Sequence, residues 1–227
     1  MKNLNIHLAE LQMKVESGVE PYNLTPQQVK IIREFDKQLR ETGILDRTIR
    51  PGFKFPDFAL PNQYGSMVEL GNLLERGPVV MNFFRGIWCP YCNLELQVLQ
   101  KSLIEFEGAG ASLVAISPQV SVMNKRIAHQ NGLRFEILSD TGNSLAKKIG
   151  ISYHLSRELI NRVYKSLGAE LSVFNGDDSW QLPLTSRFVI DIDATVISSN
   201  VDVDFRKRPD PRETLAVVKA MTRRTSI

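Results

Sequence analysis

An apolar run that leads directly into two cysteines restricts the fold more than any other feature of this chain. Residues 79–84 form this run, which is typical of a strand covered on both faces. The segment Trp88-Cys89-Pro90-Tyr91-Cys92 follows it, and apolar spacing predicts a helix from about residue 90 to residue 106. Both sulfurs are therefore expected where a buried strand gives way to the start of a helix, which indicates an α/β fold.

Cys89 and Cys92 are the only cysteines, and two residues separate them, so they can form a reversible disulfide. The thiolate is the nucleophile, and a helix N-terminus lowers a cysteine pKa from its usual value of about 8.5. Pro90 suits the first helical turn, with Cys89 at the cap and Cys92 about one turn further. We expect Cys89 to be the more exposed sulfur. Arg85 either adds positive charge beside the pair or is an ordinary strand-end residue.

Two other interpretations of the cysteines are less favoured. A zinc site needs two further ligands, and only His7, His129 and His154 remain, none of them spaced as a histidine pair. Inert core cysteines do not explain the Trp-Cys-Pro-Tyr-Cys turn. The sequence therefore predicts redox chemistry without a metal and without a cofactor.

The rest of the chain alternates strands and helices, which predicts a central mixed sheet. Before it, Thr25, Pro26 and Gln28 mark the start of a helix with a capping box. The expected units are an N-terminal helical arm over residues 1–47, an α/β domain over 48–222 and a tail over 223–227. A hairpin over residues 187–199 and a helix over 211–221 are expected near the end, whereas residues 152–181 are placed only roughly.

Composition is that of an ordinary globular protein, with 43% hydrophobic and 23% charged residues and a net charge of +3. This charge is too small to favour nucleic acid or a membrane surface as a partner. The residues from Val201 onward hold seven Lys or Arg against four Asp or Glu, and a solvated face explains them better than a phosphate site. That basic group comprises Arg206, Lys207, Arg208, Arg223 and Arg224. No signal peptide or membrane-spanning run is apparent, so we expect a cytoplasmic protein.

Several segments, in order, resemble the peroxiredoxin-like alkyl hydroperoxide reductase/thiol-specific antioxidant (AhpC/TSA) family. Residues 52–61 resemble its opening "G-x-x-x-P-x-F-x-L", residues 135–140 its "L-S-D" strand end, and residues 188–191 its "F-x-I-D" strand. The likeness covers residues 48–222, and the arm resembles that of the subgroup with "R-G-x-W-C-P-Y-C". The resemblance implies a thioredoxin-like fold with a central mixed β-sheet flanked by helices, plus the N-terminal helical arm.

The family's Pro-x-x-x-Thr-x-x-Cys pattern implies how the motif is used. Cys92 takes the place of the peroxide-reacting cysteine, Cys89 that of the threonine and Arg85 that of the proline. Glu95 matches the family's glutamate three residues after that cysteine.

Further supporting residues follow from the same resemblance. The family's late arginine corresponds to Thr185, which is also the place of the cis-proline of thioredoxins. Arg187, two residues on, lies on the same side of a strand and is a candidate substitute. Trp88 and Pro90, within the motif, complete the supporting set.

The resemblance implies a thiol oxidoreductase that reduces hydrogen peroxide or alkyl hydroperoxides through a Cys89/Cys92 dithiol–disulfide cycle. A thiol donor such as thioredoxin or glutathione would re-reduce it, and a homodimer is expected. The alternatives are thiol–disulfide exchange on a protein disulfide and a redox-responsive binding protein with little turnover. By analogy with thioredoxins Cys89 is the first nucleophile, whereas the peroxiredoxin pattern makes it Cys92. We favour Cys89, because the threonine and the arginine that support the peroxide-reacting cysteine in the family are missing here.

Overall fold

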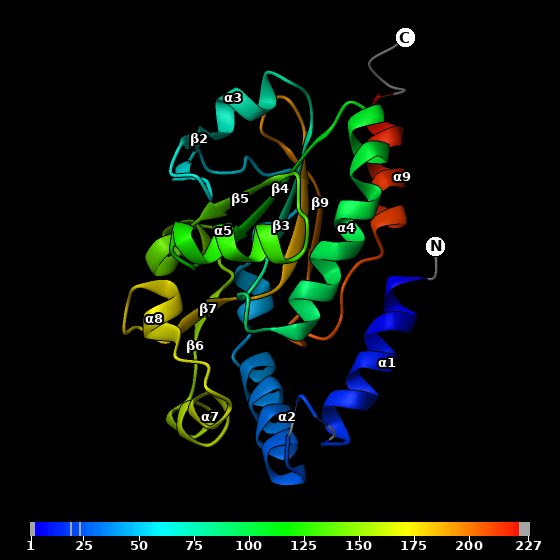
Figure 1. Ribbon diagram of the computed structural model, residues 1–227. Helices are drawn as coiled ribbons and strands as arrows, with labels where there is room; N and C mark the ends of the chain where they lie inside the picture. The colour runs from blue at the N-terminus through cyan, green and yellow to red at the C-terminus, as the bar shows by residue number, and fades with distance from the viewer. Residues whose placement is uncertain (1–2, 19, 23, 223–227) are drawn as a thin grey trace.

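A five-stranded mixed sheet lies at the centre of the protein (Figure 1). The computed structural model describes residues 3–18, 20–22 and 24–222. The strand order is β5-β4-β3-β8-β9. Strands β4 and β5 run parallel to β3, whereas β8 runs antiparallel to both of its neighbours, β3 and β9, which confirms the expected mixed sheet. The strands are β3 (Val79–Phe83), β4 (Ser112–Ser117), β5 (Glu136–Ser139), β8 (Ser186–Ile190) and β9 (Val196–Val201).

Helices flank this sheet, as the thioredoxin-like fold requires. Helix α4, which follows β3, lies beside the last helix, α9 (Figure 1). Two small antiparallel pairs, β1–β2 and β6–β7, complete the strands. The helices of this part are α3 (Leu70–Leu74), α4 (Pro90–Gly108), α5 (Ser121–Gln130), α6 (Ser144–Lys148), α7 (Arg157–Leu159), α8 (Leu171–Asn175) and α9 (Pro211–Thr222). The small pairs are β1 (Ala59–Pro61) with β2 (Met67–Glu69) and β6 (Ser152–His154) with β7 (Gln181–Pro183).

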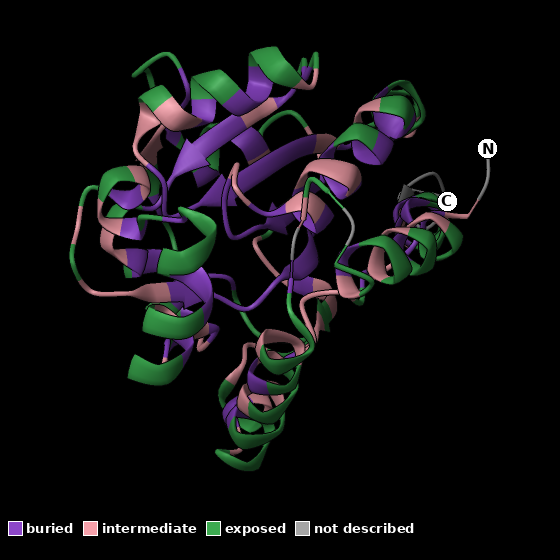
Figure 2. Cartoon of the chain, turned by 60° about the horizontal axis from the view of Figure 1, so that its bottom comes forward, coloured by how far each residue is buried: buried purple, intermediate pink, exposed green. Residues whose placement is uncertain are grey.

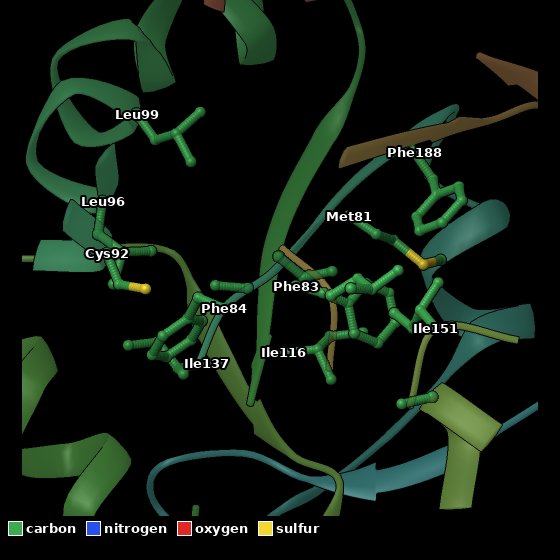
Figure 3. Packing of buried hydrophobic residues seen from close by; sticks show 14 of the residues in the cluster. Met81, Phe83, Phe84, Cys92, Leu96, Leu99, Ile116, Ile137, Ile151 and Phe188 are labelled. Carbon is green, nitrogen blue, oxygen red and sulfur yellow. The ribbon is translucent and has the colours of Figure 1, made fainter. Parts of the chain in front are cut away.

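The central strand is covered on both faces, as its composition predicts. Every residue of β3 is buried (Figure 2). Phe83 meets Phe188 of β8 edge to face, with ring centroids 5.8 Å apart. Leu96 and Leu99 of α4 also belong to this core (Figure 3). Strand β3 and helix α4 are therefore held rigidly by packing, and the loop between them is fixed at both ends.

The N-terminal arm contains helix α1 (Leu4–Glu16), helix α2 (Pro26–Glu41) and a 3-10 turn (Ile44–Arg47). The expected capping box of α2 is present: Thr25 Oγ1 accepts from Gln28 N, and Gln28 Oε1 accepts from Thr25 N. Helix α1 packs against α4, and Leu4 N donates to Asp210 Oδ2 at 3.1 Å. Helix α2 packs against α7, so both arm helices lie against the α/β part of the chain.

The structure supplies detail in two regions that the sequence left open. Residues 152–181, placed only roughly from the sequence, form β6, α7, a π-helical turn (Ile160–Tyr164), a 3-10 turn (Lys165–Leu167), α8 and β7. On α2, Ile31 and Leu39 are buried, while Val29, Ile32 and Phe35 are only half-buried, because these three line a cavity. The expected tail, residues 223–227, lies outside the described residues. Among the described helices, none has the length and apolar character to cross a bilayer.

Candidate active site

The two cysteines lie where β3 gives way to α4. Cys89 is the N-cap of α4 and Pro90 is its first residue, as expected. The loop before them is held from two sides. Gln119 Oε1 accepts from Ile87 N at 2.9 Å, and Asn93 Nδ2 donates to the carbonyl oxygens of Ile87 (2.7 Å) and Cys89 (2.9 Å). The sulfurs therefore have a fixed position relative to the sheet.

Both sulfurs are enclosed. Cys89 and Cys92 are each 0% exposed, and both are free thiols. The expectation that Cys89 is the more exposed sulfur is therefore wrong. The physical reason is that chain distant in sequence covers this end of α4: the Phe205 ring packs edge-on against Tyr91 and also covers Arg85.

Arg85 lies directly against the pair. Its Nη2 is 3.1 Å from Cys89 Sγ, and its Nη1 donates to Tyr164 Oη at 3.1 Å. The guanidinium also lies over the rings of Phe205 (3.6 Å to the centroid) and Trp88 (5.1 Å). Arg85 is only 4% exposed, which does not fit an ordinary strand-end residue. Burial alone would lower the pKa of Arg85, but the attraction of the guanidinium to Cys89 and Tyr164 in their ionised forms outweighs this, and the pKa is raised.

A second arginine, Arg208, reaches the other sulfur. Its Nη2 is 3.5 Å from Cys92 Sγ, and its Nη1 donates to Glu95 Oε2 in a very short ion pair. The prediction that this residue belongs to a solvated C-terminal face is wrong, because Arg208 is 5% exposed. Arg223 and Arg224 of that expected face lie outside the described residues.

Glu95 holds two arginines in one buried network. Arg187 Nη2 donates to its Oε1 at 2.7 Å, and Asn82 Nδ2 contacts its Oε2 at 3.3 Å. Arg187 contacts neither sulfur among the described hydrogen bonds, so Arg208, rather than Arg187, occupies the place beside Cys92. Burial lowers the pKa of Arg187, against the pull of Glu95.

The two thiols hold their proton unequally. Burial raises the pKa of Cys89 well above its ordinary value, and its hydrogen bond to Cys92 adds to the rise. Burial alone would raise the pKa of Cys92 too, but the hydrogen bond from Cys89, the charges of Arg208 and Arg85, and the backbone N–H of Arg85 outweigh it. The pKa of Cys92 is thus held well below its ordinary value, so Cys92 is the sulfur of the pair that loses its proton first.

The remaining predicted supporting residues surround this centre. Trp88 meets Tyr164 edge to face at 5.2 Å, and its Nε1 has no hydrogen-bond partner among the described residues. Thr185 immediately precedes Ser186, which pairs with Phe83 at the end of β3. Its Oγ1 is buried and has no partner within the described part of the chain.

A largely apolar cavity of about 210 Å³ lies against the site. It separates the arm from the α/β part, and Arg85, Trp88 and Pro90 form its wall toward the cysteines. Most of the remaining lining is aliphatic or aromatic, from α1, α2, β6 and the helical segment after it. The aromatic members are Tyr22, Phe35, Tyr91, Tyr153, Tyr164 and Phe205.

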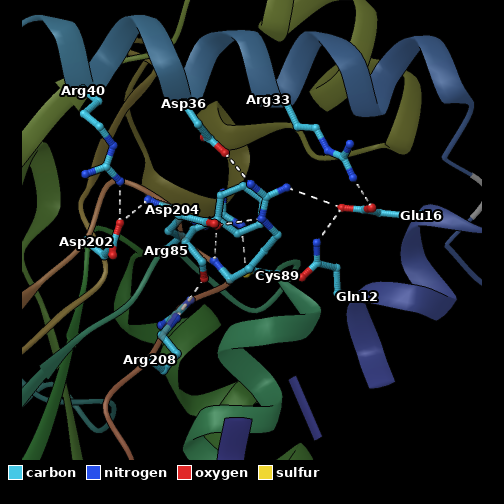
Figure 4. Close-up of polar contacts among 12 residues, drawn as sticks. Gln12, Glu16, Arg33, Asp36, Arg40, Arg85, Cys89, Asp202, Asp204 and Arg208 are labelled. Atoms are coloured by element: carbon cyan, nitrogen blue, oxygen red, sulfur yellow. Dashed lines mark hydrogen bonds and ion pairs between the residues drawn. The ribbon is translucent and has the colours of Figure 1, made fainter. Parts of the chain in front are cut away.

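Ion pairs to Arg206 close one side of this cavity. Arg206 donates to Asp36 of α2 (2.9 Å) and to Asp204 (2.6 Å), and lies 3.5 Å from Glu16 of α1. The three carboxylates are labelled in Figure 4. Burial raises the pKa of Asp36 to about 7, although Arg206 opposes the rise. One arginine thus joins both arm helices to the segment that covers the cysteines.

Sequence reasoning missed three residues of the site: Arg208, Tyr164 and Phe205. Each comes from chain more than 70 residues away from the cysteines. A basic residue and an aromatic residue at such distances carry no local pattern that could associate them with Cys89 or Cys92.

No group of three or more His, Cys, Asp or Glu residues within the described chain is arranged to hold a metal ion. His154 lies beside Gln181, and His7 lies 3.6 Å from Glu10, so neither accompanies a cysteine.

Comparisons with known proteins agree with this arrangement. Residues 51–199 match the family model described as the AhpC/TSA family. Peroxiredoxin Q, chloroplastic, of Triticum aestivum is 29% identical over 126 residues, which is 56% of this chain and 58% of that protein. The thiol-disulfide oxidoreductase ResA of Bacillus anthracis is 26% identical over 101 residues, 44% of this chain and 57% of that protein. The match thus spans less than two thirds of either relative.

The fold also matches solved structures. The crystal structure of peroxidoxin BcpB from Mycobacterium tuberculosis aligns with a TM-score of 0.60 and 24% sequence identity. The alignment covers 76% of this chain and 98% of that one. This likeness shows the thioredoxin-like fold and leaves about a quarter of the present chain outside it.

Proposed function

Because this chain belongs to the AhpC/TSA family, we propose that it is a thiol-dependent peroxidase in which Cys92 attacks the peroxide and Cys89 resolves the product. The observation that carries the proposal is an arginine on each sulfur, Arg208 on Cys92 and Arg85 on Cys89, together with a pKa that is lowered for Cys92 and raised for Cys89. This reverses the order of attack favoured from the sequence, because Arg208 supplies the charge that was thought to be missing.

The first step consumes the peroxide. The Cys92 thiolate attacks the terminal oxygen of R–O–O–H, so that an S–O bond forms and the O–O bond breaks. Cys92 becomes a sulfenic acid, and the leaving RO⁻ takes a proton to become an alcohol or water. Arg85 and Arg208 stabilise the negative charge as it moves from sulfur to oxygen, and they need no rearrangement to do so.

The second step forms the disulfide. The Cys89 sulfur attacks the Cys92 sulfenic sulfur, an S–S bond forms, the S–O bond breaks, and hydroxide leaves as water after taking a proton. Over both steps one peroxide accepts two electrons from the two sulfurs. A thiol donor of the thioredoxin or glutathione type then returns two electrons and restores the reduced pair.

Exchange with a protein disulfide remains a second candidate, favoured by the similarity to ResA. Both sulfurs are 0% exposed, so any protein that exchanges with them, whether a disulfide substrate or a thioredoxin-type donor, must first displace the chain that covers them. A small peroxide needs far less space. We place the reaction in the cytoplasm, where structural disulfides are rare and a Cys-x-x-Cys pair more often serves redox chemistry.

Rapid-mixing fluorescence tests the proposal, since Trp88 lies beside the pair. Reduced protein is mixed with hydrogen peroxide or cumene hydroperoxide, and the rate is compared with that of a free thiol. We expect a much faster rate, lost in Cys92→Ser. In Cys89→Ser we expect a sulfenic acid that dimedone traps and no internal disulfide. A wild-type rate equal to that of a free thiol, or sulfenic acid trapped on Cys89 only, would overturn the proposal.

A further inference from the structure

The N-terminal arm forms one side of the cavity beside Arg85, and the α/β part forms the rest. Residues 1–50 lie outside the stretch that matches the family model, so the match does not include the arm's side of the cavity. Its size of about 210 Å³ is below the roughly 300–1,000 Å³ of pockets that hold drug-sized ligands, which indicates a small occupant. Its apolar lining indicates that most of that occupant is hydrocarbon or aromatic.

One wall of the cavity carries an incompletely bonded cation. Arg85 is 4% exposed, and its Nε has no hydrogen-bond partner among the described residues. The described contacts of its guanidinium are Cys89, Tyr164 and the rings of Trp88 and Phe205, none of which is a carboxylate. The cavity is also lined by Glu16 and Asp36, but the described hydrogen bonds of these carboxylates and their ion pairs go to residues other than Arg85.

The charge of the site changes when the disulfide forms. In the reduced form the guanidinium groups of Arg85, Arg187 and Arg208 face two anions, the Glu95 carboxylate and the Cys92 thiolate. A disulfide removes the thiolate, and Glu95 remains bound to Arg187 and Arg208. Arg85 then loses the attraction of that thiolate and has no carboxylate among its described hydrogen bonds, although the charge of Asp36 still acts on it across the cavity. A buried charge without a bonded counterion is strongly unfavourable.

We propose that the cavity binds a small apolar monocarboxylate, with its carboxylate on Arg85 and its hydrocarbon body between the arm and the domain, and that the disulfide form binds it more tightly than the dithiol form. An arginine and a carboxylate form charge-assisted hydrogen bonds, and Arg85 is the lining arginine that has no carboxylate among its described hydrogen bonds. The redox preference rests on the proposed function, because it needs the Cys89–Cys92 disulfide. By linkage, the ligand must also make that disulfide harder to reduce.

Isothermal titration calorimetry with octanoate tests the proposal on the full-length protein, with 1-octanol as the uncharged probe of equal chain length. We expect octanoate to bind the disulfide form at least tenfold more tightly than the reduced form, and 1-octanol to bind both forms equally. A tenfold preference lowers the disulfide reduction potential by about 30 mV when octanoate saturates the protein. Equal octanoate affinity for the two forms, or no binding to either, would overturn the proposal.

Three variants separate this proposal from the peroxidase chemistry. Cys89→Ser/Cys92→Ser removes the thiolate without oxidation, so it should bind octanoate as tightly as the disulfide form under reducing conditions, even if the protein reduces no peroxide. Ile32→Trp fills the cavity from α2 and should abolish binding, whereas Ile104→Trp, at a site 69% exposed on α4, should not change it. Weak binding by the double variant would refute the charge argument independently of any redox activity.

Discussion

Replacement of Arg208 by methionine should raise the pKa of Cys92 and leave a similar volume of side chain in place. Arg208 Nη2 lies 3.5 Å from Cys92 Sγ. At an effective dielectric constant of about 20, two unit charges about 4 Å apart attract by roughly 4 kcal/mol, which corresponds to about 3 pKa units. The guanidinium charge is spread over several atoms, and water can enter the space that it leaves, so we expect a rise of about 1 to 2 units.

The assay is the ultraviolet absorbance of the thiolate, followed against pH in reduced Arg208→Met, with circular dichroism to verify folding. Arg208→Lys retains the positive charge and should keep most of the shift. Arg187 also binds Glu95, but its guanidinium contacts neither sulfur. Arg187→Met should therefore raise the pKa of Cys92 by less than Arg208→Met does. A pKa of Cys92 that stays within half a unit in Arg208→Met, or that rises equally in Arg187→Met, would refute the electrostatic role of Arg208.

Three further outcomes concern stability. The pKa of Cys92 is lower in the folded protein than its value of about 8.5 in the unfolded chain. The free energy of unfolding of the reduced protein should therefore rise by up to about 1.4 kcal/mol per pH unit as pH rises from the folded to the unfolded pKa. Urea titrations at several pH values should show this slope, and Cys92→Ser should lack it. Asp36 has a folded pKa of about 7, above the unfolded value of about 3.9, so its contribution should be lost as pH rises from about 4 to 7, and Asp36→Asn should flatten that decline in the same titrations. Thr25→Ala removes the side-chain acceptor of the capping box and should lower the free energy of unfolding by about 1 kcal/mol. Thr48→Ala is the control, because the Thr48 hydroxyl donates to a carbonyl oxygen and accepts from no backbone N–H of a helix start, and it should have a smaller effect. Equal losses in the two variants would contradict the capping argument.

Local pattern was sufficient for the parts of the structure that depend on neighbouring residues. The apolar run of β3, the Pro90 start of α4 and the Thr25 capping box all follow from contacts within a few residues, and the structure contains each of them. The mixed order of the sheet follows from strand–helix alternation and a terminal hairpin in the same way.

Local sequence patterns did not predict which residues are buried or which residues far apart in the chain are in contact. Cys89 looked exposed because helix caps usually face solvent, and nothing in its neighbourhood indicates that Phe205 packs against Arg85 and Tyr91 beside it. Arg208 was assigned to a surface face because its neighbours in sequence are also basic, and nothing local distinguishes it as the residue that binds the buried Glu95. Both errors concern contacts across more than 100 residues of chain, which a single sequence does not encode in a readable local form.

The position of Cys89 and Cys92 in one helical turn affects how long such an enzyme would survive its own substrate. A sulfenic acid on Cys92 has two competing fates: closure by Cys89, which is unimolecular, or attack on a second peroxide, which yields an irreversible sulfinic acid at a rate proportional to peroxide concentration. Closure here needs no unwinding of α4, because the cap residue already lies against Cys92. In the proposed cycle the partition between turnover and self-inactivation therefore favours turnover even when peroxide is abundant. The placement of both cysteines within one helical turn thus protects Cys92 from over-oxidation.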